Sequence, residues 1–415
     1  MFNRCRSRAS IGATCVVALV LFHPQVARAD AVLDWNRVLL ATLVGQPPFP
    51  AARYAAITQL AVFEAVNAIT GEYHPYVRPL AAPAGASVDA AVAAAAHAVL
   101  TAYFPAKTAA LDAALAATLA TIPDGQAKSD GLGTGEAAAA VMLALRANDG
   151  SAVPQFYLPV SSDPGEWQPT PSCPPVGGAF LHWRNVIPFG VPAVDRFMPP
   201  PPPPLTSGTY RRDYDEVKRV GGMNSGDRPA DRADAATFYA SFSPVTWANV
   251  AAQQVAVEMG QSPAENAHAL ALVNMAVNDA AIASFTAKYL YTRWRPETAI
   301  RAAETDGNKK TDADPGFVPF IVAPCFPSYP SNHASLSGAA REVLERLYGR
   351  DGHDVTFAAQ GLTLHYTTFE AITNDVDDAR VFGGIHFRFD QDAGAVLGRR
   401  VGAYVYEHNL RPARE

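Results

Sequence analysis

The feature that most constrains this chain is the placement of its alanines and prolines. Residues 53–69 carry apolar side chains at three- and four-residue steps, which is the period of a helix. Residues 87–103 and 106–122 are rich in alanine, the strongest helix former, and each stretch ends near a proline, Pro105 and Pro123. Alternating runs of β-branched residues, which would predict strands, are nearly absent. The pattern therefore predicts an all-α fold.

Proline also divides the chain into two helical halves. Residues 151–208 hold 15 of the 34 prolines, and this segment is expected to be irregular because proline lacks a backbone N–H. We expect a helical bundle at 30–150, a Pro/Trp-rich connection at 151–208 and a second bundle, with the active site, at 209–415. Further helices are predicted at 135–148, 233–242, 244–259, 264–291, 335–348, 354–372 and 390–408.

The two halves share a short sequence similarity. Residues 59–65 (QLAVFEA) resemble residues 274–280 (NMAVNDA). Alanine-rich helices also produce such similarities by chance, so the duplication of one bundle is a hypothesis at this point. It would mean that two similar bundles pack together, with the chemistry in the second.

The N-terminus has the layout of a secretory signal. Arginines at positions 4, 6 and 8 precede an apolar run at 11–22, and residues 27–29 (ARA) supply the small residues that signal peptidase recognises. We expect residues 1–29 to be cleaved off near Ala29 and the mature protein to be secreted or periplasmic. The alternative, an anchoring helix, needs a longer apolar run.

The composition excludes several classes of protein. With 49% hydrophobic residues the chain can bury a sizeable core, and a net charge of -6 without a basic stripe argues against nucleic acid as a partner. The sequence contains no run of about 18 apolar residues, which a transmembrane anchor would need. After signal cleavage two cysteines remain, Cys173 and Cys325, which either form one disulfide or are two buried thiols.

Three segments of the second half carry the candidate chemistry. The first contains Lys288 and Arg295, whose spacing of two helical turns places both cations on one helix face. The second, residues 330–333 (PSNH), precedes a predicted helix whose free N–H groups favour an anion, with His333 beside them to give or take a proton. The alternatives are solvated cations for the first segment and a helix-capping serine with a surface histidine for the second.

The third segment runs from Arg380 to Asp390. His386 and Asp390 are one helical turn apart if this segment is helical, so the carboxylate is expected to bind one imidazole nitrogen. That contact makes the other nitrogen a better nucleophile or metal ligand. Gly383 and Gly384 are expected to let the backbone approach whatever His386 touches. The alternative is a buried His–Asp pair without a ligand.

Together the three segments supply the groups that a tetrahedral oxyanion requires: three cations, a hydroxyl, backbone donors and two histidines. In this order, Lys-x6-Arg-Pro, Pro-Ser-x-His and Arg-x5-His-x3-Asp resemble the three signature motifs of the superfamily of vanadium-dependent haloperoxidases and type 2 phosphatidic acid phosphatases. Segments around Trp167, Trp183 and Tyr214 also resemble secreted bacterial haloperoxidases. The resemblance implies an all-helical fold of two four-helix bundles.

The resemblance also implies a role for each candidate residue. His386 would be the axial ligand of vanadate, or the phosphorylated nucleophile of a phosphatase, and Asp390 would orient it. His333 would be the acid–base group, and Phe326 matches a position that is aromatic in the chloride-oxidising members. Five residues would bind the oxygens of vanadate or phosphate: Lys288, Arg295, Ser331, Asn332 and Arg380.

Two positions depart from the usual motifs. Asn332 stands where the family usually has glycine, and its side chain is expected to enter the oxyanion pocket while its backbone N–H is retained. Ala379 stands where serine is common, which removes a hydroxyl donor. Both changes leave oxyanion binding in place and bear on the efficiency of halide oxidation.

Three functions fit these motifs. The first is a vanadate-dependent haloperoxidase, which oxidises a halide with hydrogen peroxide to hypohalous acid and so halogenates a small organic acceptor. The second is a metal-independent acid phosphatase, which hydrolyses phosphomonoesters through a phosphohistidine and needs no vanadate. The third is a non-catalytic oxyanion-binding protein. The extra N-terminal half and the Pro/Trp-rich connection favour the first by resemblance, because the minimal phosphatases of the superfamily are shorter.

Overall fold

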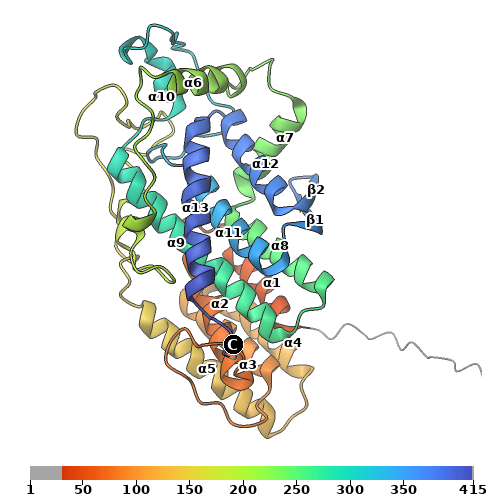
Figure 1. The fold of residues 1–415 in the computed structure, drawn as a ribbon. Coiled ribbons are helices and arrows are strands. Elements are labelled where there is room, and N and C mark those ends of the chain that lie inside the picture. The colour runs from red at the N-terminus through yellow and green to blue at the C-terminus, as the bar shows by residue number, and fades with distance from the viewer. Residues whose placement is uncertain (1–29, 414–415) are drawn as a thin grey trace, which may run out of the picture.

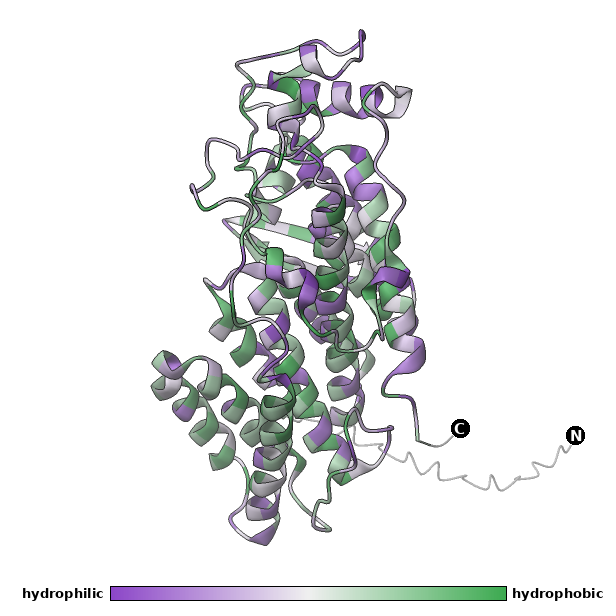
Figure 2. Ribbon diagram, turned by 90° about the vertical axis from the view of Figure 1, so that its left-hand side faces the viewer, coloured by the Kyte–Doolittle hydropathy of each residue, from purple (hydrophilic) through white to green (hydrophobic). Residues whose placement is uncertain are grey.

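The computed structural model describes residues 30–413, and the predicted signal segment lies outside them. Within this range the predicted all-α class is confirmed: thirteen α-helices accompany a single two-stranded hairpin. The helices of the two halves pack along one long axis, with loops and short helices at one end (Figure 1). Hydrophobic residues gather along the long helices, and hydrophilic residues are frequent in the loops and short helices (Figure 2).

The first bundle has helix boundaries that its sequence explains. The Asp30 side chain accepts the N–H of Val32 and so caps the first helix. The second helix begins with proline and ends at Gly71 in a left-handed conformation. The elements are α1 (Ala31–Leu43), α2 (Pro48–Thr70), α3 (Val88–Tyr103), a 3₁₀ turn (Pro105–Lys107), α4 (Thr108–Ala120) and α5 (Gln126–Arg146).

The second bundle is built around its longest helix, α9 (Pro263–Tyr291). Among the described residues this is the one helix that is long and apolar enough to cross a membrane, but 94% of its apolar window is buried inside the protein. It is therefore the core helix of the bundle. The other helices of this half are α6 (Gly208–Val220), α7 (Ala230–Ser241), α8 (Pro244–Met259), α10 (Pro296–Arg301), α11 (Asn332–Tyr348), α12 (Phe369–Phe382) and α13 (Arg388–His408).

The two bundles share a packing scheme. In the first, α2 packs against α3 and α5, and in the second α9 packs in the same way against α11 and α13. A Cβ on Gly131 of α5 would lie 2.4 Å from the carbonyl oxygen of Ser87, the cap of α3. A Cβ on Gly394 of α13 would lie 2.6 Å from the carbonyl oxygen of Ser331, the cap of α11. These matched close contacts support the duplication hypothesis.

The carboxylates of the two similar segments also have the same role. Glu64 of α2 accepts the N–H of Tyr76 at 2.6 Å. Asp279 of α9 accepts the N–H groups of residues 189–191 at 2.6 to 3.0 Å. Burial raises the pKa of Asp279 to about 6. Each carboxylate fastens an irregular segment to the central helix of its bundle, and in the second bundle that segment is the Pro/Trp-rich connection.

The Pro/Trp-rich connection packs closely on the helices. Trp167 and Trp183 are buried. Cys173 of the connection forms a disulfide with Cys325, with the two Cα atoms 5.4 Å apart. The bond ties the connection to the segment that precedes the second motif.

One predicted helix is wrong. Residues 354–372 do not form a helix, because β1 (Asp351–Ala359) and β2 (Leu362–Thr368) pair as an antiparallel hairpin and α12 begins only at Phe369. Gln360 and Gly361 form its two-residue turn, and both have the positive φ that such turns require. Val355 and Phe357 are buried on one face, so the period of this segment is two.

Candidate functional site

Lys288 and Arg295 come together, but not on one helix face as predicted. Helix α9 ends at Tyr291, Thr292 takes a left-handed conformation with φ 42°, and Arg295 is the residue that precedes α10. The reversal of the chain at Thr292 brings the two cations together. Both are fully buried over the ring of Phe326, with Lys288 Nζ 5.3 Å and Arg295 Cζ 5.0 Å from its centre.

Backbone carbonyls hold these two cations in place. Lys288 Nζ donates to the carbonyl oxygens of Pro327 and Ser328, at 2.8 Å each, and Arg295 Nε donates to that of Phe326 at 2.9 Å. Burial, together with the charge of Arg295, lowers the pKa of Lys288 well below its usual range. Burial lowers the pKa of Arg295 to about 9. Both shifts reflect the cost of keeping two cations together away from water.

The second motif forms the start of α11. Ser331 is its cap, with Oγ accepting the N–H of Ala334 at 3.4 Å. Helix geometry leaves the N–H groups of the first turn without partners inside the helix, so those of Asn332 and His333 are available to an anion. The Asn332 side chain is anchored to the core helix, because Nδ2 donates to Ser284 Oγ of α9 at 2.7 Å.

His333 is the least buried of the predicted site residues and lines a cavity of about 460 Å³. The walls of this cavity come from the α1–α2 and α7–α8 connections, so the first bundle helps to enclose it. Burial and the charges of Arg380, Arg295 and Lys288 lower the pKa of His333 well below its usual range. The imidazole is therefore neutral near pH 7, with one of its ring nitrogens unprotonated.

His386 lies between a carboxylate and a cation. Its Nδ1 donates to Asp390 Oδ2 at 2.9 Å, and its Nε2 accepts from Arg295 Nη1 at 3.0 Å. Burial and the surrounding cations lower the pKa of His386 well below its usual range, so the ring is neutral with its proton on Nδ1. The predicted His–Asp contact is present, although α13 begins only at Arg388 and the two residues do not share one helical turn. Nε2 is thus the nitrogen that faces the cations.

The two glycines before His386 do not have the role expected from the sequence. Gly384 has φ 79°, and a Cβ there would lie 2.2 Å from the carbonyl oxygen of Gly221 at the end of α6. A Cβ on Gly383 would lie 2.7 Å from the Ile321 side chain. Both glycines therefore allow neighbouring segments of the protein to pack closely, and this packing fixes the chain that carries His386.

Arg380 is the third buried cation among the predicted site residues. It is buried near the end of α12, and burial lowers its pKa to about 10. Its Nε and Nη2 atoms and the Nη2 atom of Arg295 are buried without hydrogen-bond partners. Among the predicted site residues, three cations stand against the single carboxylate of Asp390. Unpaired buried donors are costly, so this arrangement fits a multiply charged oxyanion such as vanadate or phosphate.

One member of this cluster, Ser328, is not among the residues predicted from the sequence. Its Oγ donates to Asp390 Oδ2 at 2.5 Å and lies 3.2 Å from His386 Nδ1. The one available signal was its position two residues before Pro330, in the loop that leads to the second motif.

Phe326 belongs to an aromatic cluster that both bundles build. Its ring lies 5.4 Å from that of Phe285 on α9 and 6.0 Å from that of Phe49 on α2, measured between centres. Phe180 of the Pro/Trp-rich connection lies 6.5 Å away. The predicted pocket residue is thus fixed by three different parts of the chain.

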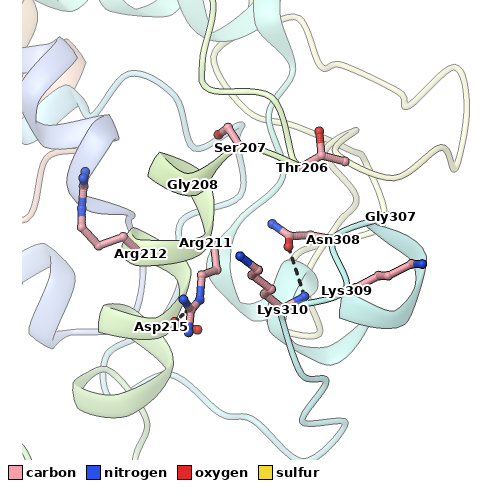
Figure 3. Close-up of a pocket in the computed structure, with 10 residues that line it drawn as sticks. All are labelled: Thr206, Ser207, Gly208, Arg211, Arg212, Asp215, Gly307, Asn308, Lys309 and Lys310. Carbon is pink, nitrogen blue, oxygen red and sulfur yellow. Dashed lines mark hydrogen bonds and ion pairs between the residues drawn. The ribbon is translucent and has the colours of Figure 1, made fainter.

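A separate cavity of about 450 Å³ lies between the start of α6 and the loop at 307–310 (Figure 3). It contains none of the predicted site residues. Four exposed basic residues line the cavity: Arg211, Arg212, Lys309 and Lys310. Arg211 pairs with Asp215 at 2.8 Å. Exposed and partly paired cations are usual on a protein surface, so we assign no chemistry to this cavity.

Comparison with known proteins finds similarity in the second half of the chain. Residues 268–415 match the domain family described as VCPO second helical-bundle domain. Vanadium chloroperoxidase of Curvularia inaequalis is 34% identical over 102 residues, and vanadium-dependent bromoperoxidase of Ascophyllum nodosum is 35% identical over 127 residues. These stretches cover 21% and 27% of this chain, and only 16% and 23% of the two relatives.

Solved structures share the fold over most of the chain. A bacterial vanadium-dependent iodoperoxidase superposes with a TM-score of 0.78 at 23% identity, covering 93% of this chain and 97% of its own. A bacterial vanadium-dependent chloroperoxidase in its apo form superposes with a TM-score of 0.71 at 19% identity, covering 90% of this chain and 97% of its own. Residues 268–415 therefore match the second helical-bundle domain of this family model, and the described chain shares its fold with a bacterial vanadium-dependent iodoperoxidase and a bacterial vanadium-dependent chloroperoxidase.

Proposed function

We propose that this protein is a secreted vanadate-dependent haloperoxidase, which oxidises a halide with hydrogen peroxide to hypohalous acid and thereby halogenates a small organic acceptor. The observation that carries the proposal is the set of buried, unpaired guanidinium N–H groups of Arg295 and Arg380 beside Nε2 of His386. The named activities of the relatives support the same chemistry.

The side chains of the site would act through charge and proton position. Bound vanadate supplies the activation of hydrogen peroxide towards the halide. The cations Lys288, Arg295 and Arg380 would bind its oxygens, and His386 Nε2 would ligate the metal. Asp390 keeps the proton of His386 on Nδ1, so that Nε2 keeps its lone pair, which accepts from Arg295 Nη1 in this structure and would bind the metal in its place. A further role falls to the neutral imidazole of His333, which would accept on its unprotonated ring nitrogen the proton that hydrogen peroxide loses.

Secretion is part of this proposal. The signal-like layout of residues 1–29 suggests export, and the disulfide between Cys173 and Cys325 fits an oxidising compartment. Mass measurement of protein recovered from the medium or periplasm tests it, and a mass that includes residues 1–29 would contradict it.

Reconstitution tests the enzymatic proposal. Protein freed of metal is incubated with orthovanadate, and bromination of a cyclic diketone is followed with bromide and hydrogen peroxide. We expect turnover that depends on vanadate and that is lost in His386→Ala. Vanadate binding without oxidation of any halide would contradict a haloperoxidase and favour a non-catalytic oxyanion-binding protein.

The same geometry gives the alternative function its own prediction. In a phosphatase, Nε2 of His386 would attack phosphorus, and His333 would protonate the leaving oxygen. Hydrolysis of p-nitrophenyl phosphate that vanadate inhibits would favour this alternative, whereas a haloperoxidase gains its activity from vanadate.

A further inference from the structure

A third and larger cavity, of about 750 Å³, lies between the two bundles. Its walls come from the starts of α1 and α3, the end of α2 and the connection between α8 and α9. It contains none of the predicted site residues.

This cavity is the duplicated counterpart of the cavity at His333. The cavity at His333 is the catalytic cavity of the proposed function, and its counterpart is named the second cavity. Residues 45–46 (GQ) and Pro48 line the catalytic cavity, and residues 260–261 (GQ) and Pro263 line the second. In both cases these residues lead into the central helix of a bundle, with proline as its first residue. Each cavity is therefore closed by the entrance to the other bundle's central helix.

The helix caps extend this correspondence and change its chemistry. Ser243, the cap of α8, lines the catalytic cavity, and Asp30, the cap of α1, takes the same place in the second. His333 is the second residue after the cap of α11, and Asp89 is the second residue after the cap of α3. At both positions the second cavity thus has an aspartate where the catalytic cavity has a serine or a histidine.

Buried amide oxygens add further acceptors. Asn266 lines the second cavity, and Ala51 lines the catalytic one. The two residues correspond because each lies three positions after the proline that begins its central helix. Asn266 is 1% exposed, its Nδ2 donates to Asp30, and its Oδ1 has no hydrogen-bond partner. Gln261 Oε1 is buried without a partner as well. Buried carbonyl oxygens without partners are uncommon, so these two atoms point to a ligand that donates hydrogen bonds.

We propose that the second cavity binds a small organic cation, namely an ammonium compound with an apolar body. The ammonium group would donate to Asn266 Oδ1 and Gln261 Oε1, and nearby carboxylates would offset its charge. Apolar side chains for the rest of the ligand come from Leu33, Val88 and Val257. The described residues contain no cluster of His, Cys, Asp and Glu arranged as a metal site, and the volume far exceeds that of one ion.

Calorimetry with three matched probes tests the charge preference. The full protein is titrated with 2-phenylethylammonium chloride, with neutral 2-phenylethanol and with the anion phenylacetate. We expect the ammonium compound to bind at least about tenfold more tightly than the alcohol, and phenylacetate to bind more weakly still. Equal affinity of the ammonium compound and the alcohol, or no binding of the ammonium compound at millimolar concentration, would overturn the proposal.

Variants then locate the site. Asn266→Ala installs the residue of the corresponding catalytic position, and Asp89→Asn removes one carboxylate. Each is expected to weaken ammonium binding at least about tenfold. Glu258→Gln removes an exposed acid on α8 outside the cavity and should leave the affinity unchanged. Unfolding temperatures establish that the variants fold, and Asp89→Asn should retain any bromination activity. Unchanged affinity in a folded Asn266→Ala protein would refute the site.

Discussion

Asp390 connects the residues of the site to one another. Its Oδ2 atom accepts from Ser328 Oγ, from the N–H of Phe387 and from His386 Nδ1. Burial raises the pKa of Asp390 to about 6, and the bond from Ser328 opposes that rise. Because the ionised carboxylate fixes the tautomer of His386, the lower pH limit of activity should follow the ionisation of Asp390.

Removing the Ser328 hydroxyl should therefore move that limit. In Ser328→Ala the pKa of Asp390 rises further above about 6, and the acid limb of the pH–activity profile is expected to shift upward by about one unit. Ser335→Ala, which removes a buried hydroxyl bonded to its own helix, is the control. An unshifted profile in a folded Ser328→Ala protein would contradict this role.

Arg380 gives a second prediction at the residue scale. Its unpaired Nε and Nη2 atoms are assigned to the oxyanion, so Arg380→Gln should weaken vanadate binding by roughly 10- to 100-fold, or about 1.5–3 kcal/mol. Binding can be followed by titration calorimetry or vanadium NMR. Arg341→Gln, whose side chain pairs with Glu345 and Glu370, should leave the affinity unchanged.

The candidate residues could be selected from the sequence for a physical reason. In a chain with few charges, cations and histidines next to predicted helix ends stand out, and the structure brings the three segments around one cluster. The path of the chain between Lys288 and Arg295 was not predictable from periodicity, because the helix stops at the left-handed residue Thr292. Ser328 was missed because a single serine in a loop has no pattern.

At the scale of elements, tight packing of the Gly383–Gly384 turn holds the third motif in place. Gly384→Ala combines a positive φ with a Cβ 2.2 Å from the Gly221 carbonyl oxygen, so it should lower the unfolding free energy by more than about 2 kcal/mol. Gly352→Ala is the matched control, because its φ of 83° is also positive but its Cβ meets nothing within 4 Å. Thermal denaturation measures both. Equal losses would mean that backbone strain alone, and not the contact with α6, is responsible.

Helices with strong alanine content were predictable from the sequence, whereas the β1–β2 hairpin was not recognised. Its strands contain Thr, Val, Phe and Tyr in alternation, and the turn is a glutamine followed by glycine, which is a weaker hairpin signal than asparagine-glycine. The start of α5 was also missed, since its glycines suggest a loop. Gly131 and Gly135 are required there because a Cβ on either would collide with α3.

At the scale of the whole molecule, the disulfide joins the Pro/Trp-rich connection to the second bundle. Cys173 and Cys325 are 152 residues apart, so their bond restricts a large loop of the unfolded chain. Replacing both by serine should lower the unfolding free energy by about 2–5 kcal/mol, measured in denaturant. A reducing agent should lower the stability of the wild-type protein but not that of the variant. Equal sensitivity of both proteins would show that the effect does not come from this bond.

The shared enclosure of the cavity at His333 has a consequence for engineering. Residues of the α1–α2 connection form one side of it, although they precede the three motifs by more than half the chain. In the proposed function, the contacts available to an incoming acceptor would thus be encoded separately from the reactive groups. Grafting that connection from one relative onto another should transfer acceptor selectivity while leaving vanadate affinity intact, whereas excising the first bundle should open the imidazole to bulk solvent.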